Sequence, residues 1–189
     1  AFMTGDEWEG TNVTIPYKEA VIPYLDVIDD TAKAIGAVNT VVNKGGKLYG
    51  YNTDILGMES LIRLLNVDLK DKKVAILGSG GTSMTATALA KSYPTREIIH
   101  VSRSPKDGAI SYEDLSANHK DLQILINTTP VGMYPKSFGV SPVDLDHFPE
   151  LVGIVDVIYN PLRTQLVLEG PKREIPSFGG LFMLIFQAY

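Results

Sequence analysis

The chain has 189 residues, 44% of them hydrophobic, so it can bury a core as one large domain or two small ones. Its 22 acidic residues outnumber its 17 basic ones, and the net charge of −5 comes without any basic run. This charge balance argues against nucleic acid and against an anionic membrane surface as partners, and we expect neither. A small molecule is the expected partner.

The residue types that hold metals or form disulfides are scarce. The chain has no cysteine, which excludes a disulfide framework, a thiolate nucleophile and a cysteine-type metal site. The three histidines, His100, His119 and His147, are isolated from one another in the sequence. We therefore expect no metal, and the lack of cysteine is compatible with a cytoplasmic protein.

The first third of the chain alternates short strand and helix patterns. A β-branched run predicts a strand at residues 12–15. A helix is expected over 17–26, with Pro23 expected to bend it or break it in the middle. An Asp cap and a Gly stop predict a helix at 29–36. A Gly-Gly turn between alternating residues predicts a β-hairpin over 38–52, and helical spacing predicts a further helix over 54–66.

A polar, charged stretch at residues 66–73 marks the expected boundary between two units. Beyond it, continuous apolar strands alternate with helical patterns, as in a parallel sheet that is buried on both faces. A helix is expected over 83–93, and the expected strands are 73–78, 97–102, 122–127 and 151–158. The sequence thus predicts an α/β protein in which a smaller unit precedes a doubly wound nucleotide-binding domain.

A lysine stands at an unusual place in "GTNVTIPYK", residues 10–18. Lys18 comes where a strand should end and a helix should begin, and a helix N-terminus carries a partial positive charge. An ammonium there is disfavoured by a few tenths to ~1 kcal/mol. Two interpretations stay open: Lys18 is an ordinary surface residue, or its site makes its proton easier to release.

A glycine-rich turn, "GSGGTS" at residues 78–83, joins the first strand of the second unit to the next helix. Glycines 78 and 80 permit a close approach of a pyrophosphate to the helix N-terminus, although a plain tight turn is the alternative. After the second strand, Arg103 stands between two serines, where an NAD-binding domain would carry an acidic residue. A guanidinium and two hydroxyls suit a 2′-phosphate; otherwise Arg103 is a solvated loop residue.

Eight blocks occur together in one order: "GTNVTIPYK", "AIGAVNT", "GYNTD", "GSGGTS", "SRS", "NTTPVGM", "DVIYNPLRT" and "GGLFML" with "FQA" after it. In this order and spacing they cover nearly the whole chain, which resembles the shikimate dehydrogenases. The resemblance implies a two-domain α/β fold. A substrate-binding α/β domain would span 1–70 and a Rossmann-like, doubly wound NADP-binding domain 71–180. Residues 181–189 would begin a C-terminal helix that returns to the substrate domain.

The resemblance also implies an activity and the residues that perform it. The reaction is the reversible NADPH-dependent reduction of 3-dehydroshikimate to shikimate, on the pathway to aromatic amino acids, by a monomer or homodimer. Lys18 matches the catalytic lysine and Asp54 its aspartate partner, although local sequence alone favours a plain helix N-cap for Asp54.

The remaining matches fall into two groups. The residues implied around the substrate are Asn12, Thr14, Asn39, Thr53, Tyr159 and Gln187. Those implied around the cofactor are Gly78, Ser79, Gly80, Gly81 and Thr82 at the pyrophosphate, Ser102, Arg103 and Ser104 at the 2′-phosphate, and Thr128, Val157 and Gly180 beside the nicotinamide.

The front of the chain departs from the family pattern. The family begins with a β-α unit whose Ser-x-Ser pair holds the substrate carboxylate, and nothing before Gly10 resembles it. Residues 1–66 also supply few strands for a sheet, and the chain stops inside an expected helix. We therefore expect the substrate domain to be incomplete here, with a front segment and a tail outside these residues.

Two other functions compete with this one. The first is the broader relative that also oxidises quinate and often uses NAD; an acidic residue in place of the Ser-Arg-Ser clamp would indicate it, and that clamp has none. The second is a non-catalytic NADPH-binding or regulatory module, against which the presence of both Lys18 and Asp54 argues.

Overall fold

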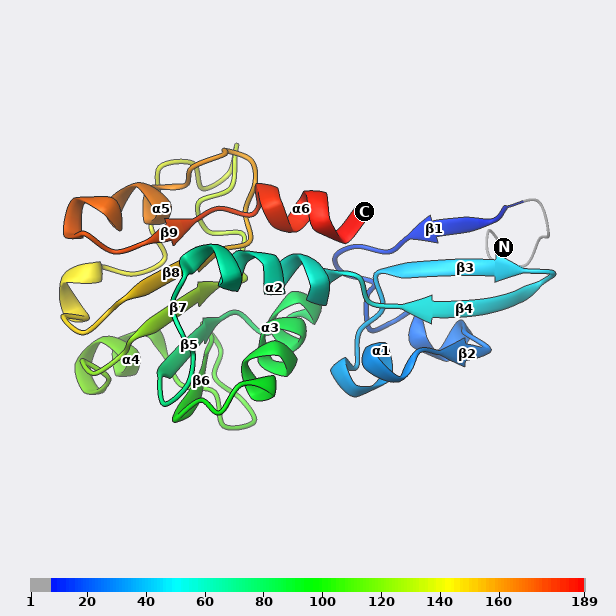
Figure 1. The fold of residues 1–189 in the computed structure, drawn as a ribbon, viewed down its shortest axis with the longest axis horizontal. Helices are drawn as coiled ribbons and strands as arrows, with labels where there is room; N and C mark the ends of the chain where they lie inside the picture. The colour runs from blue at the N-terminus through cyan, green and yellow to red at the C-terminus, as the bar shows by residue number, and fades with distance from the viewer. Residues whose placement is uncertain (1–7, 189) are drawn as a thin grey trace.

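The computed structural model describes residues 8–188 and contains two sheets. One sheet has four strands in the order β1-β3-β4-β2, and the other has five in the order β6-β5-β7-β8-β9. The two sheets lie at opposite ends of an elongated molecule (Figure 1). The ligand-binding residues expected from the sequence come from both parts of the chain. The prediction of a mixed α/β fold with a Rossmann-like unit is confirmed. The expected front segment and tail concern residues outside this sequence, so they stay a prediction.

The four-stranded sheet is built around the predicted hairpin. Its strands are β1 (Gly10–Asn12), β2 (Val27–Ile28), β3 (Thr40–Lys44) and β4 (Lys47–Tyr51). β3 and β4 pair antiparallel across the Gly45-Gly46 turn, so the hairpin prediction is confirmed. β1 pairs antiparallel with β3, and β2 pairs parallel with β4. The strand expected at 12–15 therefore lies slightly earlier in the chain.

The helix predicted from the Asp cap is confirmed as α1 (Asp30–Ile35). The Asp29 carboxylate accepts hydrogen bonds from the backbone N–H groups of Thr31 and Ala32, as a helix N-cap does. Gly36 ends the helix in the left-handed conformation. Local sequence alone was sufficient for this element.

The helix predicted over 17–26 was wrong. The chain there forms turns and a short 3-10 helix, η2 (Ile22–Tyr24). Pro23 has no N–H to donate to the preceding turn, so an α-helix through this stretch would lose a hydrogen bond and meet a steric clash. Backbone groups pair elsewhere instead: the Lys18 carbonyl accepts from the Val38 N–H at 2.8 Å.

The five-stranded sheet is parallel throughout, as predicted. Its strands are β5 (Lys73–Leu77), β6 (Glu97–Val101), β7 (Ile124–Asn127), β8 (Gly153–Asp156) and β9 (Ser177–Phe178). The predicted helix after β5 is α3 (Gly81–Ser92), and the sequence prediction missed α4 (Tyr112–Asn118), α5 (Gln165–Glu169) and β9. Two short 3-10 helices, η3 (Leu145–His147) and η4 (Pro171–Arg173), complete this part.

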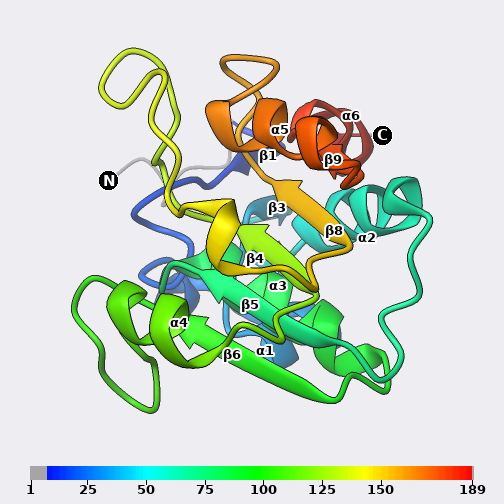
Figure 2. The same ribbon diagram turned by 90° about the vertical axis from the view of Figure 1, so that its left-hand side faces the viewer.

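Both faces of this sheet are buried. In β5, Val74 and Ile76 belong to one core cluster, whereas Ala75 and Leu77 belong to another. Successive side chains of a strand point to opposite faces, so the two clusters cover the two faces. α3 and α4 lie on different sides of the sheet (Figure 2). A fully apolar strand such as β5 is therefore explained by burial on both sides.

Helix α2 (Asp54–Leu65) joins the two parts. Its side chains Met58, Leu61 and Ile62 pack into the same core cluster as Ile76 of β5. Met183 of α6 (Leu181–Ala188) joins this cluster, and α2 and α6 are packed together where the two parts meet (Figure 1). α2 therefore belongs to the core of the second sheet, while its first residue faces the other part. The boundary at 66–73 stays a prediction.

Within residues 8–188, no helix combines the length and apolarity needed to cross a membrane.

This packing predicts that substitutions at two leucines of α2 affect the stability of the protein differently. Leu61 is fully buried and Leu56 is 58% exposed. We expect Leu61→Ala to lower the free energy of unfolding by about 2–5 kcal/mol, because it leaves a cavity in the core. Leu56→Ala, the matched control on the same helix, should change it by no more than about 0.5 kcal/mol. Denaturant unfolding of both variants is the measurement, and equal effects would contradict the placement of α2.

Candidate functional site

Lys18 lies in the turn region after β1, with its side chain largely buried. The side chain is 12% exposed, and its ammonium forms an ion pair with the Asp54 carboxylate. The Thr82 hydroxyl lies 3.5 Å from the same nitrogen. No α-helix begins at Lys18, so the expected effect of a helix end on this lysine has no basis in the structure. The neighbouring carboxylate is the main electrostatic feature of its surroundings.

Asp54 is the first residue of α2 and is not its N-cap. The N-cap position belongs to Thr53, whose side chain makes no capping bond. The Asp54 carboxylate instead contacts side chains: Oδ2 faces Lys18, and Oδ1 accepts a hydrogen bond from Asn39 Nδ2 at 2.9 Å. The alternative reading of Asp54 as a plain cap therefore does not describe this structure.

Asn39 connects the pair to the C-terminal helix. It is buried at the start of β3, and its Nδ2 lies 3.1 Å from Thr53 Oγ1 and 3.4 Å from Gln187 Oε1. Its Oδ1 accepts from the Thr53 backbone N–H at 2.9 Å. Side chains far apart in the sequence thus meet through one amide, which fixes the carboxylate that faces Lys18.

A cavity of about 350 Å³ opens in front of Lys18 and Asp54. It lies between the turn after β1, the C-terminal ends of β7 and β8, and α6. The predicted residues on its wall are Thr14, Lys18, Asp54, Thr82, Thr128, Val157, Tyr159, Gly180 and Gln187. Asn39 and Thr53 stand behind Asp54, and Asn12 is exposed on β1 away from this wall. The sequence prediction missed Thr129, Met133, Asn160 and Met183 on the wall.

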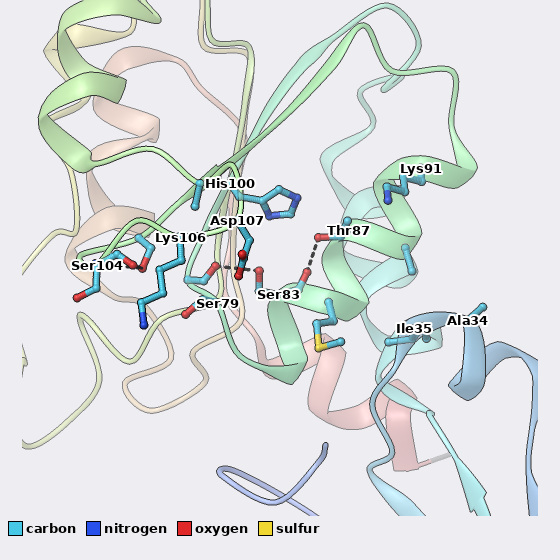
Figure 3. Close-up of a pocket in the computed structure, with 15 residues that line it drawn as sticks. Ala34, Ile35, Ser79, Ser83, Thr87, Lys91, His100, Ser104, Lys106 and Asp107 are labelled. Carbon is cyan, nitrogen blue, oxygen red and sulfur yellow. Dashed lines mark hydrogen bonds between the residues drawn. The ribbon is translucent and has the colours of Figure 1, made fainter. Parts of the chain in front are cut away.

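A second cavity, of about 480 Å³, lies over the start of α3 and the loop after β6 (Figure 3). The predicted residues on its wall are Gly78, Ser79, Ser102 and Ser104. Arg103 is exposed on the same loop but is not among the wall residues. Three basic side chains that the sequence prediction missed line the cavity instead: Lys91, His100 and Lys106.

The sequence prediction missed these three basic residues for a common reason. His100 lies among apolar residues of a strand, and Lys91 and Lys106 lie in stretches typical of an ordinary protein surface. The three residues meet on one cavity wall only in the folded chain. Burial lowers the pKa of His100, and the nearby positive charge of Lys91 lowers it further. The imidazole is thus shifted toward its neutral form while no anion lies in the cavity.

The glycine-rich turn has the geometry that a phosphate group requires. Gly78 adopts φ +113, and a Cβ there would lie 2.7 Å from Thr128 Oγ1. Gly80 occupies the N-cap of α3 and provides no side-chain cap, and the Ser83 N–H donates to the Gly80 carbonyl at 2.8 Å. The backbone N–H groups of Gly81 and Thr82, before it, lie where a helix N-terminus can bind an anion. At Gly81 a Cβ would lie 3.0 Å from Lys18 Cβ. Glycine there permits the close approach between the lysine and the turn.

A buried carboxylate supports the loops after β7 and β8, which border the first cavity. Asp156 at the end of β8 accepts hydrogen bonds from Thr164 Oγ1 at 2.6 Å, Asn127 Nδ2 at 3.1 Å and the Ile158 N–H at 3.1 Å. Asn127 Oδ1 in turn accepts from Thr129, so the loops after β7 and β8 are tied together. Burial without a cation raises the pKa of Asp156 to about 6, although these hydrogen bonds act in the opposite direction.

These features define a class of protein. The chain has an α/β fold that contains a parallel sheet. A glycine-rich turn without a side-chain cap precedes α3, and a lysine–aspartate pair lies near the C-terminal ends of β7 and β8. Such a turn is the phosphate-binding element of dinucleotide-binding domains. Within residues 8–188, no three side chains of the metal-ligating types gather at one place.

Comparison with known proteins identifies the family. Residues 1–41 match the family described as shikimate dehydrogenase substrate binding domain. The shikimate dehydrogenase (NADP(+)) of Clostridium beijerinckii is 40% identical over 189 residues, which covers 95% of this chain and 69% of that protein. The chain belongs to the shikimate dehydrogenase family.

Solved structures agree with this assignment. The fold is similar to shikimate dehydrogenase 1 from Peptoclostridium difficile, with a TM-score of 0.85, 40% identity, and coverage of 95% of this chain and 68% of that one. It is also similar to shikimate 5-dehydrogenase from Thermus thermophilus in complex with NADP(H) and shikimate. There the TM-score is 0.82 and the identity 30%, with coverage of 96% of this chain and 70% of that one.

The raised pKa of Asp156 predicts a pH-dependent stability. In the unfolded chain this carboxyl ionises near its ordinary pKa of 3.8, whereas in the folded protein it keeps its proton up to about pH 6. Its contribution to stability is therefore fully present below about pH 4 and is lost as the pH rises through about 6, by about 3 kcal/mol in total. Asp156→Asn should remove this contribution, because an amide keeps the shape and does not titrate.

The measurement is the free energy of unfolding of both proteins between pH 4 and 7. Other carboxylates, such as Asp121, have lowered pKa values and produce the opposite trend, so the difference between the two proteins is the quantity to follow. The parent should lose stability relative to the variant as the pH rises. A difference that stays constant would show that Asp156 titrates equally in both states.

Proposed function

We propose that this protein catalyses the reversible NADPH-dependent reduction of 3-dehydroshikimate to shikimate, in aromatic amino-acid biosynthesis, with Lys18 and Asp54 as the catalytic pair. The observation that carries the proposal is the ion pair of Lys18 and Asp54 on the wall of a cavity that also reaches the ends of β7 and β8. The relatives with printed names of shikimate dehydrogenase (NADP(+)) support both the reaction and the cofactor.

Reduction of a ring ketone requires a hydride at carbon and a proton at oxygen. NADPH supplies the hydride when it is bound. Lys18 Nζ lies on the cavity wall and can donate this proton to the ring oxygen, and in the opposite reaction it can accept the proton back. Asp54 keeps Nζ in place through the ion pair and can accept a hydrogen bond from a neighbouring ring hydroxyl.

The remaining substrate contacts would come from other side chains on the wall of the first cavity. Thr14 and Tyr159 each carry a hydroxyl group on the cavity wall, and Gln187 brings an amide from α6. Asn39 and Thr53 act from behind by fixing Asp54. Asn12, exposed on β1, is the member of the proposed substrate set that this structure supports least.

The cofactor would bind along the N-terminus of α3, where no side chain caps the helix. Ser79 and the backbone of Gly78 to Thr82 would hold the pyrophosphate, and Ser102, Arg103 and Ser104 would stand near the 2′-phosphate, at the end of β6. Thr128, Val157 and Gly180 would border the nicotinamide. The expected domains, 1–70, 71–180 and 181–189, remain part of this proposal, as do a cytoplasmic location and a monomer or homodimer.

The test of the mechanism is Lys18→Ala. Loss of a general acid or base lowers turnover by about 10²- to 10⁴-fold, and this lysine is the expected proton donor. Lys33→Ala is the matched control, since Lys33 is an exposed lysine of α1 that lines neither cavity. Initial rates of shikimate oxidation with NADP⁺ are compared at equal folding, which circular dichroism and unfolding curves establish. Near-normal turnover of Lys18→Ala would remove this lysine from the mechanism.

A further inference from the structure

The first turn of α3 packs directly against Lys18. A Cβ atom at Gly81 would lie 3.0 Å from Lys18 Cβ and 3.3 Å from Lys18 Cδ, so the lysine side chain runs close along the backbone of this turn. The next residue, Thr82, brings its hydroxyl oxygen to 3.5 Å from Lys18 Nζ. Thr82 also lies on the wall of the first cavity, together with Lys18 and Asp54. The start of α3 is therefore part of the surroundings of the ammonium.

Thr82 differs from the other hydroxyl residues of α3 in what its side chain contacts. The other four hydroxyls donate to backbone carbonyls three to five residues earlier in the chain, and they belong to Ser83, Thr85, Thr87 and Ser92. Two of them, Ser83 and Thr87, are drawn with these bonds in Figure 3. Within the part of the chain that the structure describes, the Thr82 hydroxyl has Lys18 as its hydrogen-bond partner instead of a backbone carbonyl.

The two neighbours of Lys18 Nζ leave one of its N–H groups for the cavity. A protonated lysine has three donors and no acceptor. Among residues 8–188, Asp54 accepts from one of these donors and the Thr82 hydroxyl oxygen accepts from a second. The third is left for a ligand in front of the pair. A contact of 3.5 Å is long for a hydrogen bond, so the Thr82 contact should be weaker than that with the carboxylate.

We propose that Thr82 is a positioning residue for proton transfer: its hydroxyl fixes the rotation of the Lys18 ammonium, so that one N–H group faces the substrate ketone. The inference rests on the proposed function, in which Lys18 donates the proton. It gives the Thr82 side chain a task that is separate from the expected contact of its backbone with the pyrophosphate. One residue of the glycine-rich turn thus serves the cofactor with its backbone and the proton donor with its side chain.

A hydroxyl suits both protonation states of the lysine. As hydride adds to the carbonyl carbon, the π electrons of the ketone move to its oxygen, which takes a proton from Nζ and leaves Lys18 as a neutral amine with a lone pair. A hydroxyl is both acceptor and donor, so Thr82 Oγ1 accepts from the ammonium before the transfer and can donate to the amine after it. An ionised carboxylate only accepts, so Asp54 cannot take the second task.

The test uses substitutions that separate the hydroxyl from the size of the side chain. Thr82→Val keeps the shape without the hydroxyl, Thr82→Ala loses both, and Thr82→Ser keeps the hydroxyl. Thr85→Val is the matched control, because Thr85 lies on the same helix, bonds to the Gly81 carbonyl and lines neither cavity. The measurements are kcat and KM of shikimate oxidation with NADP⁺, and the dissociation constant of NADP⁺ by calorimetry, at equal folding established by unfolding curves.

Thr82→Val and Thr82→Ala should each lower kcat by about 3- to 10-fold, the size of one lost hydrogen bond. The dissociation constant of NADP⁺ should stay within about twofold, because the backbone N–H of residue 82 remains. Thr82→Ser and the control Thr85→Val should keep kcat within about twofold of the parent. In a Lys18→Ala background, Thr82→Val should change kcat by less than about twofold, because the hydroxyl then has no ammonium to hold.

Three results would overturn the inference: a loss in Thr82→Ser as large as in Thr82→Val, an equal loss in Thr85→Val, or a full effect of Thr82→Val in the Lys18→Ala background. A loss confined to NADP⁺ affinity would also overturn it, because the hydroxyl would then act on the pyrophosphate. A parent protein without shikimate turnover would refute the proposed function together with this inference. An active parent with an equally active Thr82→Val would refute this inference alone.

Discussion

The ion pair of Lys18 and Asp54 is the interaction on which the candidate site depends. Both side chains are largely buried, and a buried charge without a partner is strongly destabilising. Each partner therefore requires the other, although they lie in different parts of the molecule. The bond from the Val38 N–H to the Lys18 carbonyl and the bonds of Asn39 then limit where the two charges can be. The four-stranded sheet thus positions the lysine and holds the carboxylate from behind.

Helix α2 connects this ion pair to the core of the parallel sheet. Its first residue is Asp54, and its later residues Met58 and Leu61 are fully buried against that sheet and α6. Close packing makes such a core resistant to small displacements. The helix therefore transmits the rigidity of the dinucleotide-binding sheet to the carboxylate, and α6 adds Gln187 to the same network. The candidate site contains residues from both parts of the chain, but the core around the parallel sheet is the main constraint on its geometry.

Sequence reasoning succeeded where local chemistry decides the structure. The Asp29 cap, the Gly45-Gly46 turn and the apolar strand at β5 each carry their own signal. It was less successful where contacts between distant residues contribute. The break at Pro23 could be expected locally, but the bond from the Val38 N–H to the Lys18 carbonyl could not, and β9 is a short strand paired with its neighbour β8. The Lys18–Asp54 contact was reached through the family pattern, whereas Lys91, His100 and Lys106 come from separate segments and meet on the wall of the second cavity only in the folded chain.

Two buried carboxylates, one on the wall of the first cavity and one beneath its loops, show why proximity alone does not assign a catalytic role. Asp54 lies on the wall with an ammonium beside it, so it can contact a ligand and Lys18 together. Asp156 has hydrogen bonds but no cation, and burial raises its pKa. It is not among the wall residues; it ties Asn127 to Thr164 beneath the loops that border the cavity. A buried carboxylate that is satisfied by neutral donors fixes the position of backbone, whereas one that shares a cavity with a proton donor can take part in proton transfer.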